Sequence, residues 1–279
     1  MRRCNLILIE GVPGSGKTTL AAAIAGQLTA AGVPTRLVLE GDLNHPADYE
    51  MIAHYDARDF ADLLRRFPEA SGVLARNVES HGDDRFVAYR RLAQQGAGLD
   101  DAVLAELAQH DVYETPSPET YGRLAIQRWE RFVAEVQGGP VVILESCFLQ
   151  NPLTVLLAKH NLAPAPAVAH LQRLAAAVRP LDPLLVYLWQ PDTRATLEHA
   201  AAERPADWLN FVIGYVTGQA WGRATGQAGF DGMVAFYEMR KTLELDALPR
   251  LGIPTLAVEN SDQTAALPAV LAHLEVGAP

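Results

Sequence analysis

Residues 11–18 read Gly-Val-Pro-Gly-Ser-Gly-Lys-Thr, and the types and spacing of these residues suit the binding of a phosphate chain. The three glycines permit backbone turns that a Cβ atom would forbid, so that successive N–H groups can converge on one anion. The lysine ammonium would reach the outer phosphates of a nucleotide, and the threonine hydroxyl would bind Mg²⁺. The alternative is a glycine-rich turn that binds nothing. The predicted nucleotide ligands are Gly11, Pro13, Gly14, Ser15, Gly16, Lys17, Thr18 and Thr19.

The elements around this loop are those that would position it. An apolar run at 5–9 predicts a strand, and a helix-forming run at about 18–31 follows the loop and ends at Gly32. A second apolar run at 36–39 predicts another strand. Strand, crossover helix and strand form a unit that implies a parallel sheet, and ligands bind at the carboxyl ends of such strands.

Polar residues follow the second predicted strand. A carboxylate at this edge would accept a proton from an attacking hydroxyl or hold Mg²⁺ through water. The alternative is a solvated loop whose aspartates cap helices. Glu40 and Asp42 are candidate catalytic groups, and Asp42, His45 and Asp48 are candidate acceptor ligands.

A further apolar run at 141–144 ends in Glu145. This pattern is typical of a buried central strand that delivers a carboxylate to a metal, so Glu145 and Thr18 are the predicted Mg²⁺ ligands, with Glu145 binding directly or through water. The alternative role for Glu145 is to cap the next helix. Gln150 and Asn151 follow at the same edge and are candidate acceptor ligands.

The segment from about 45 to 137 is charged, and its pattern is mostly helical. Residues 84–95 and 100–109 predict amphipathic helices, and Ser117 followed by Pro118 predicts the start of a helix that runs to about 136. The segment is long for a crossover, so we expect a helical insertion that forms the acceptor-side wall or lid. Arg123 and Arg128 would contact an anionic acceptor, although solvated helix charges are the commoner role of such residues.

The rest of the chain predicts further α/β elements. These are a stiff connector at 163–166, helices at 167–178, 193–203, 208–216, 233–248 and 267–274, and strands at 184–188 and 254–258. Within them, Trp208, Phe211 and Tyr215 are expected in the core, the glycines from 222 to 232 in a flexible loop, and Arg240 and Lys241 on a solvated face. The sequence thus predicts one α/β domain over 1–279 with the P-loop NTPase fold: a five-stranded, mostly parallel sheet flanked by helices, with a lid region at about 190–232.

Composition narrows the class of partner. A net charge of −10 and a pI near 5.3 argue against a nucleic-acid-binding face, which would be basic, and favour a small molecule. Cys4 and Cys147 are too few for a disulfide framework, so buried reduced thiols are expected. No run reaches the 18 or more apolar residues of a membrane helix, so a cytoplasmic protein without membrane partners is expected; a homodimer stays open.

The strand ends resemble a known family. Glu40 at the end of the second strand, Ile-Leu-Glu-Ser-Cys-Phe at 143–148 and Lys-His-Asn at 159–161 resemble the deoxyribonucleoside kinase and thymidylate kinase group of P-loop kinases. In the nucleoside kinases, a Glu-Pro pair ends the second strand and supplies the base, and a Glu-Arg-Ser triplet ends the third. This chain has Glu40-Gly41 and Glu145-Ser146 instead. The resemblance covers the sheet and its loops.

The resemblance implies ATP as the phosphoryl donor and an active site closed by lid arginines. By position, Arg194 and Arg204 would be these arginines and would neutralise charge on the transferred phosphoryl group. Asn260, in the loop 259–262, would lie near adenine. The implied activity is Mg·ATP-dependent transfer of the γ-phosphoryl group to a nucleoside, a nucleotide, or another hydroxyl-bearing metabolite or antibiotic.

Three other classes stay open at this point. A nucleotide switch or ATPase would use water as the acceptor, but the chain lacks the Asn-Lys-x-Asp motif of GTPases. A sulfotransferase would use a similar loop without a metal, whereas Gly-Lys-Thr together with Glu145 favours a metal-bound triphosphate. A pure binding module follows if Glu40, Asp42 and Glu145 are only structural.

Overall fold

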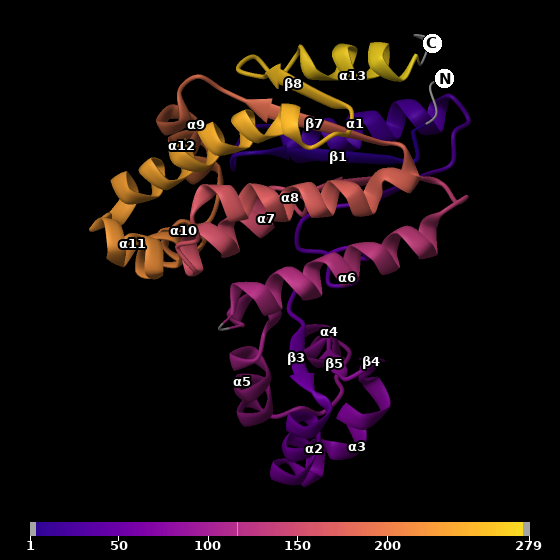
Figure 1. Cartoon of the computed structure of the whole chain (residues 1–279), viewed down its shortest axis with the longest axis vertical. Coiled ribbons are helices and arrows are strands. Elements are labelled where there is room, and N and C mark those ends of the chain that lie inside the picture. Colours follow the sequence, from indigo (N-terminus) through magenta and orange to yellow (C-terminus); the bar gives the residue numbers. More distant parts are fainter. Residues whose placement is uncertain (1–3, 116, 276–279) are drawn as a thin grey trace. The chain divides into compact units, whose positions relative to one another are not determined.

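The phosphate-loop sequence lies between a buried strand and a helix. We describe residues 4–115 and 117–275 of a computed structural model (Figure 1). Strand β1 (Leu6–Gly11) is buried along its whole length, as expected for a central strand covered on both faces. Helix α1 (Lys17–Ala30) begins directly after Gly16, whose φ of 92° is left-handed and favours glycine.

β1 is the middle strand of a parallel sheet. The strand order is β2-β6-β1-β7-β8, and the other strands are β2 (Thr35–Val38), β6 (Val141–Glu145), β7 (Pro183–Trp189) and β8 (Thr255–Glu259). Figure 1 shows β8, β7 and β1 side by side. The register pairs Ile9 with Glu145, so the end of β6 lies beside the start of the loop. This topology confirms the predicted fold class.

Helices complete the part of the chain formed by residues 4–40 and 125–275, one of two compact units. After β6 come α7 (Gln150–Leu153), the π-helical turn η2 (Thr154–Lys159), α8 (Pro164–Val178) and η3 (Arg179–Leu181). After β7 come α9 (Thr193–Glu203), α10 (Ala206–Gly218), α11 (Ala220–Thr225), α12 (Gly229–Ala247) and η4 (Leu248–Arg250), and α13 (Ala266–Leu274) follows β8.

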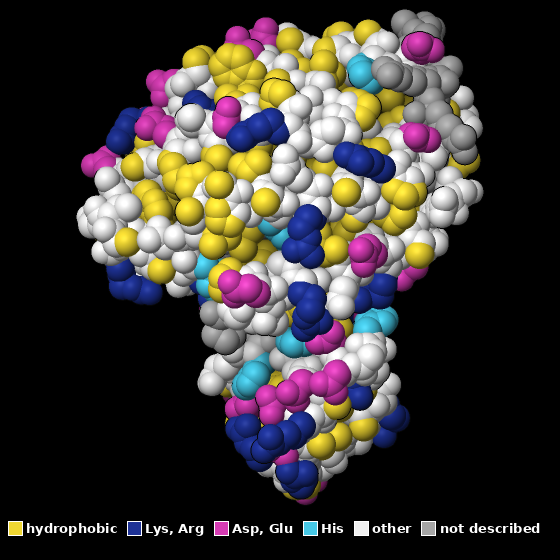
Figure 2. All heavy atoms as spheres, in the orientation of Figure 1, with side chains coloured by type: hydrophobic (Ala, Val, Ile, Leu, Met, Phe, Trp, Pro, Cys, Tyr) yellow, Lys and Arg dark blue, Asp and Glu magenta, His cyan; other side chains and the backbone are white. Residues whose placement is uncertain are grey.

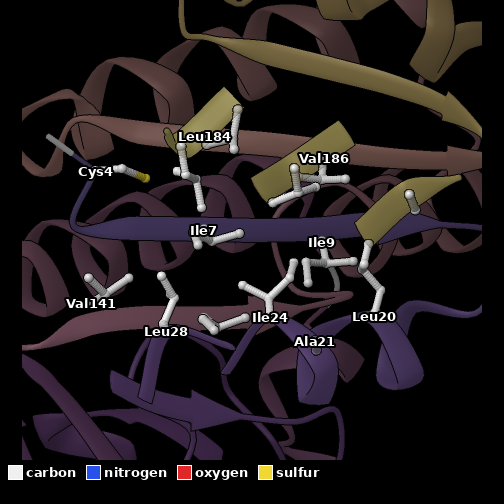
Figure 3. Close-up of a cluster of buried hydrophobic side chains, with 14 of the residues drawn as sticks. Cys4, Ile7, Ile9, Leu20, Ala21, Ile24, Leu28, Val141, Leu184 and Val186 are labelled. Carbon is white, nitrogen blue, oxygen red and sulfur yellow. The ribbon is translucent and has the colours of Figure 1, made fainter. Parts of the chain in front are cut away.

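The core of this unit lies on both faces of the sheet. On one face, Ile7 and Ile9 of β1 pack with side chains of α1, α13 and the neighbouring strands, including Ile24, Leu184 and Val186 (Figure 3). On the opposite face, the Tyr187 hydroxyl donates to Glu244 of α12 at 2.5 Å. Cys4 and Cys147 are buried free thiols, as predicted.

Several predictions for this unit are wrong, and three of them concern its helices and their packing. Pro164 lies in the first turn of α8, where proline needs no amide partner, so 163–166 is not a separate connector. Gly222 and Gly232 were expected in a flexible loop but lie inside α11 and α12. A Cβ on Gly222 would be 1.9 Å from the Thr217 carbonyl oxygen, so this glycine permits close packing. Phe211, expected in the core, is 68% exposed.

Residues 41–124 form the second compact unit. It contains a three-stranded antiparallel sheet of order β3-β5-β4, where β3 is Ala53–Asp56, β4 is Glu79–His81 and β5 is Asp84–Val87. The helices are α2 (Ala57–Arg66), α3 (Pro68–Asn77), α4 (Tyr89–Gln94), α5 (Asp101–Gln109) and the turn η1 (Val112–Glu114). Helix α6 (Pro118–Val136) starts in this unit and continues into the other, and its bounds match the prediction.

The insertion was therefore predicted with too much helix. Residues 84–87 form β5 rather than the first turn of a helix at 84–95. The missed signal is Gly82-Asp83 between β4 and β5, a two-residue turn with glycine at φ 59°, the position that hairpin turns give to glycine. On the face of this unit seen in Figure 2, acidic and basic side chains lie close together, and Arg66 pairs with Glu106 at 2.7 Å.

Asp111 is the buried acid of this second unit. It is 6% exposed, accepts the Tyr113 amide at 2.9 Å through Oδ1 and accepts the Tyr89 hydroxyl at 3.0 Å through Oδ2. Burial raises the pKa of Asp111 to about 6, although the two hydrogen bonds oppose the shift.

Among the residues described, none of the helices has the length and apolar character needed to cross a membrane.

We predict that Asp111 makes the protein less stable as the pH rises. The unfolded carboxyl ionises near its ordinary pKa of 3.8, whereas the folded one keeps its proton up to about 6, so the folded state binds more protons between these values. The free energy of unfolding should therefore fall between pH 4 and pH 6, by up to about 3 kcal/mol. Urea titrations of the wild type and Asp111→Asn at several pH values measure this, because asparagine keeps the acceptor for Tyr113. Equal pH slopes in the two proteins would contradict the prediction.

Candidate active site

Lys17 is the centre of the candidate site. Its side chain is buried, and its ammonium donates to the Gly11 carbonyl oxygen at 3.2 Å, the Val12 carbonyl oxygen at 3.1 Å and Gln150 Oε1 at 3.2 Å. An ammonium has three donors, so all of them are used within the protein. Burial lowers the pKa of Lys17, and the Glu40 and Glu10 carboxylates oppose that shift. To bind a phosphate, Lys17 would exchange these acceptors for phosphate oxygens.

The loop that surrounds Lys17 is held by its neighbours at several points. The Ser15 carbonyl oxygen accepts Asn260 Nδ2 at 2.9 Å and Gln190 Nε2 at 3.2 Å. Gly11 is close to β7, where a Cβ would lie 2.3 Å from the Leu188 carbonyl oxygen. The Ser15 hydroxyl is buried and makes no hydrogen bond with any described residue, which leaves a donor at the loop for a ligand. These contacts hold the backbone of the loop in place.

Thr18 and Glu145 meet at the carboxyl edge of the sheet. The Thr18 hydroxyl donates to Glu145 Oε1 at 3.1 Å, and the Glu40 amide donates to the same oxygen at 3.2 Å. Glu145 is 3% exposed, and its second oxygen is buried and accepts no hydrogen bond from the described residues. A buried carboxylate oxygen with an open coordination position beside a threonine hydroxyl suits a hard cation.

Gln150 connects the lysine with the glutamate that ends β2. Its Oε1 accepts from Lys17, and its Nε2 donates to Glu40 Oε1 at 3.1 Å. The Gln150 amide donates to Glu10 Oε2 at 2.9 Å, and the Phe148 amide donates to Glu10 Oε1 at 2.7 Å. Gln150 was predicted to bind an acceptor; in the structure its side-chain polar atoms contact Lys17 and Glu40, and the side chain is buried.

A pocket of about 360 Å³ opens beside the loop. Its walls come from Gly14, the end of β7, the start of α9 and the loop after β8, and they include Gln190, Thr196, His199 and Asn260. Gly14 has a φ of 84°, and a Cβ there would be 2.9 Å from the Thr196 carbonyl oxygen and from the Ala200 Cβ. The loop and α9 are thus in close contact, and Asn260, a predicted nucleotide ligand, is one of the residues that line the pocket.

The two predicted lid arginines have different surroundings. Arg194 donates to Asp231 at 2.6 Å at the start of α12, and its side chain is half-exposed. The Arg204 guanidinium stacks on Trp208 with its carbon 4.3 Å from the ring centroid. Burial raises the pKa of Tyr237 on α12, and the Arg204 cation opposes this shift.

The remaining predicted acceptor ligands lie in several places. Within the unit 41–124, Asp42 caps its own turn by accepting the Asn44 amide at 2.8 Å, His45 is buried, and Asp48 accepts the Tyr113 hydroxyl at 2.5 Å. Arg123 makes two bonds to Asp84, the shorter one 2.6 Å long. Arg128 and Asn151 are half-buried in the other unit, and Pro13 and Thr19 lie on the loop and α1.

Sequence reasoning missed two charged residues beneath the loop. Glu10 is fully buried, and burial raises its pKa to about 7. Its sequence signal is an acid inside the apolar run that forms β1. Arg240, predicted on a solvated face, has an exposed fraction of zero and lies against the Gly11 carbonyl oxygen, with Nη2 at 3.4 Å. The local sequence does not indicate that Arg240 is buried, because Arg240 and Lys241 together look like an exposed pair of basic residues.

Comparison with solved structures finds nucleoside and nucleotide kinases. Thymidylate kinase from Candida albicans aligns with 98% of this chain and 93% of its own, at 14% identity and a TM-score of 0.45. Deoxyadenosine kinase from M. mycoides, solved with bound dATP, aligns with 97% of this chain and 99% of its own, at 10% identity and a TM-score of 0.41. No protein-family model matches the chain, and no curated protein sequence matches it.

We predict that Gly14→Ala destabilises the protein more than Gly41→Ala. The two glycines have nearly the same left-handed φ, 84° and 83°, so alanine costs about 1–2 kcal/mol in conformation at each. Only Gly14 has neighbours in the way, and forcing α9 aside adds about 1–3 kcal/mol; Gly41 has nothing within 4 Å of a Cβ. Chemical denaturation of both variants measures the difference. Equal losses would show that the contact between the loop and α9 is not tight.

Proposed function

We propose that the protein is an Mg·ATP-dependent phosphotransferase that moves the γ-phosphoryl group to a hydroxyl or phosphate of a small molecule. The observation that carries this proposal is the contact of the Thr18 hydroxyl with Glu145, at 3.1 Å, next to a buried loop lysine and at the same sheet edge as Glu40. A loop that only bound an anion would not need two carboxylates at its mouth. A metal-bound triphosphate and an acceptor would use both.

The residues around Thr18 fit Mg²⁺. Thr18 and Glu145 would hold the ion, Glu145 through its open oxygen or through water, and the ion would neutralise charge on the β- and γ-phosphates. Among the described residues there is no cluster of three or more His, Cys, Asp or Glu that could hold a metal. The other ligands would therefore be phosphate oxygens and water, as is usual for Mg²⁺.

Lys17 and the loop amides would bind and orient the phosphates. The low dielectric around Lys17 strengthens its interaction with an incoming anion, and its three present acceptors keep the ammonium ready at the correct place. Most of the catalytic effect would come from positioning and charge stabilisation, because phosphoryl transfer needs little covalent chemistry from the protein. Arg194 and Arg204 are the proposed further cations at this edge; Arg194 would have to leave Asp231, and Arg204 would have to leave the Trp208 ring, to reach a phosphate.

Glu40 is the proposed base. Its side chain is exposed, so an acceptor hydroxyl can approach it, and Gln150 Nε2 fixes one of its oxygens at 3.1 Å. Gln150 also separates the carboxylate from Lys17, because its amide contacts both. Without this neutral bridge the two charges could pair directly, and neither would then be available to the reactants. Asp42 remains the alternative base, and the insertion at about 45–137 remains the acceptor side predicted from the sequence.

The donor nucleotide would extend from the loop into the pocket beside Gly14. The pocket continues from the phosphate loop to Asn260 and Gln190, which both bond the loop itself. A base bound there would contact the same residues that hold the loop. This supports a nucleotide over inorganic polyphosphate as the donor.

We predict that γ-labelled ATP with Mg²⁺ transfers its label to an acceptor drawn from nucleosides, nucleotides and a metabolite extract. Lys17→Ala should abolish transfer, because the β- and γ-phosphates lose their cation, and should leave the fold intact by circular dichroism. Lys159→Ala, which removes a lysine outside the loop, is the control and should retain turnover. Acceptor-independent release of phosphate would replace the kinase with an ATPase, and full turnover by Lys17→Ala would rule out the phosphate-loop assignment.

We also predict that Glu145→Gln raises the Mg²⁺ concentration needed for half-maximal turnover by about 10–100-fold. Glutamine keeps an oxygen for the Thr18 hydroxyl and the Glu40 amide but lacks the charge that attracts the ion. Magnesium titrations of the wild type and the variant at saturating ATP measure the shift. An unchanged magnesium profile would show that Glu145 is structural.

A further inference from the structure

We propose that Arg240 is a positioning residue for the phosphate loop, which takes over the Gly11 carbonyl oxygen when Lys17 turns toward a bound phosphate chain. This inference rests on the proposed function, since it assumes that Lys17 binds phosphate. Arg240 is on α12, far from the loop in sequence, and its side chain is completely buried. Its Nη2 lies 3.4 Å from the Gly11 carbonyl oxygen, which also accepts Lys17 Nζ at 3.2 Å. Two cations thus share one acceptor.

Arg240 is held in place by buried partners. Its Nε lies 3.1 Å from Glu244 Oε1, and the Tyr187 hydroxyl donates to the other oxygen of Glu244 at 2.5 Å. Its Nη1 donates to the Thr154 hydroxyl at 2.9 Å, and the Tyr237 ring stacks on the guanidinium at 4.7 Å. A buried arginine with one carboxylate partner can stay charged, and its two Nη groups are directed at η2 and at the loop.

The same network also reaches Gln150. The Thr154 hydroxyl that receives Arg240 Nη1 donates in turn to the Gln150 carbonyl oxygen at 2.6 Å. The Gln150 side chain is one of the three acceptors of Lys17. Arg240 therefore contacts one acceptor of Lys17 directly and supports the backbone of another through Thr154.

On binding a phosphate, Lys17 would leave its three acceptors, and these differ in whether they keep another donor. A buried carbonyl oxygen that loses its donor costs free energy, and this cost would oppose phosphate binding. The Val12 carbonyl oxygen also accepts the Ser15 amide at 3.1 Å, so it keeps a donor. Gln150 Oε1 is on a side chain that can turn. The Gly11 carbonyl oxygen is part of the backbone and cannot turn, and Arg240 is the donor that stays with it.

Lys241, the residue after Arg240 on α12, contacts the segment that follows β7. Lys241 donates to the Gln190 carbonyl oxygen at 2.9 Å and to the Pro191 carbonyl oxygen at 3.3 Å, at the end of β7. Helix α12 is therefore attached to the edge that carries the nucleotide pocket as well as to the loop. Arg240 does not depend on the substrate for its own position, which is what a positioning residue requires.

The experiment is a double-mutant cycle on nucleotide affinity. One arm replaces the buried triad by apolar residues of similar size, Arg240→Met with Glu244→Leu and Tyr187→Phe, because such replacements often leave stability unchanged. The other arm is Lys17→Ala. Isothermal titration calorimetry with ATP and Mg²⁺ gives the affinity of the wild type, each arm and the combination, and thermal unfolding checks that each protein is folded.

We expect the triad replacement to weaken ATP binding about tenfold when Lys17 is present and less than about twofold in the Lys17→Ala background, where no lysine leaves the Gly11 carbonyl oxygen. Equal losses in both backgrounds, or no loss in a folded triad variant, would overturn the role of Arg240. If the triad variant does not fold, Arg240→Lys replaces it, since lysine cannot contact Glu244 and Gly11 together, and the same criterion applies. Absence of ATP binding by the wild type would overturn the proposed function and this inference with it.

Discussion

The burial of the Lys17 ammonium is the constraint on which the rest of the site depends. An unpaired cation in this environment would lose its proton or destabilise the fold, so three acceptors must be within reach. Two of them, the Gly11 and Val12 carbonyl oxygens, are available because the loop turns back over its own lysine, which requires left-handed glycines at 14 and 16. The third is Gln150, whose carbonyl oxygen is bonded to Thr154. The loop, α7 and η2 are thus organised around one charge.

The parallel sheet makes this arrangement possible. Strands β2, β6 and β1 run in the same direction and are adjacent, so Glu40, Glu145 and the loop come to one edge although more than 100 residues separate Glu40 from Glu145. Each strand delivers one polar group at its end, where the backbone leaves the sheet and amides become available. The Glu40 amide bonded to Glu145 is an example. A change in register of one residue in β6 would turn Glu145 to the other face and separate it from Thr18.

The sequence was informative where chemistry depends on neighbours in the chain and uninformative where it depends on neighbours in space. The loop, strand β1 before it, helix α1 after it and the place of Glu145 at the end of β6 follow from local patterns, because glycine positions and apolar runs are local properties. Arg240 could not be assigned, since it contacts Thr154 on η2 and Gly11 on β1, and its ion-pair partner Glu244 is bonded by Tyr187 of β7. Strand β5 was missed because its four residues were read with the helix that follows them, although Gly82-Asp83 marks a hairpin. Phe211 was expected in the core because an apolar residue on an amphipathic helix usually is.

The buried charges beneath the loop are balanced in a way that suits an anionic ligand. Burial raises the pKa of Glu10 to about 7, so near neutral pH a substantial part of it is uncharged. With Glu10 neutral, the cations Lys17 and Arg240 beneath the loop are matched in number by the acids Glu145 and Glu244. A fully ionised Glu10 would add a negative charge on the strand that leads into the loop and would weaken the attraction of Lys17 for phosphate. The two amides that Glu10 accepts, from Phe148 and Gln150, fix the turn after β6 whether or not the carboxyl is protonated at its other lone pairs. Glu10 can therefore shape the turn that carries Gln150 and, in its neutral form, does not oppose a bound anion.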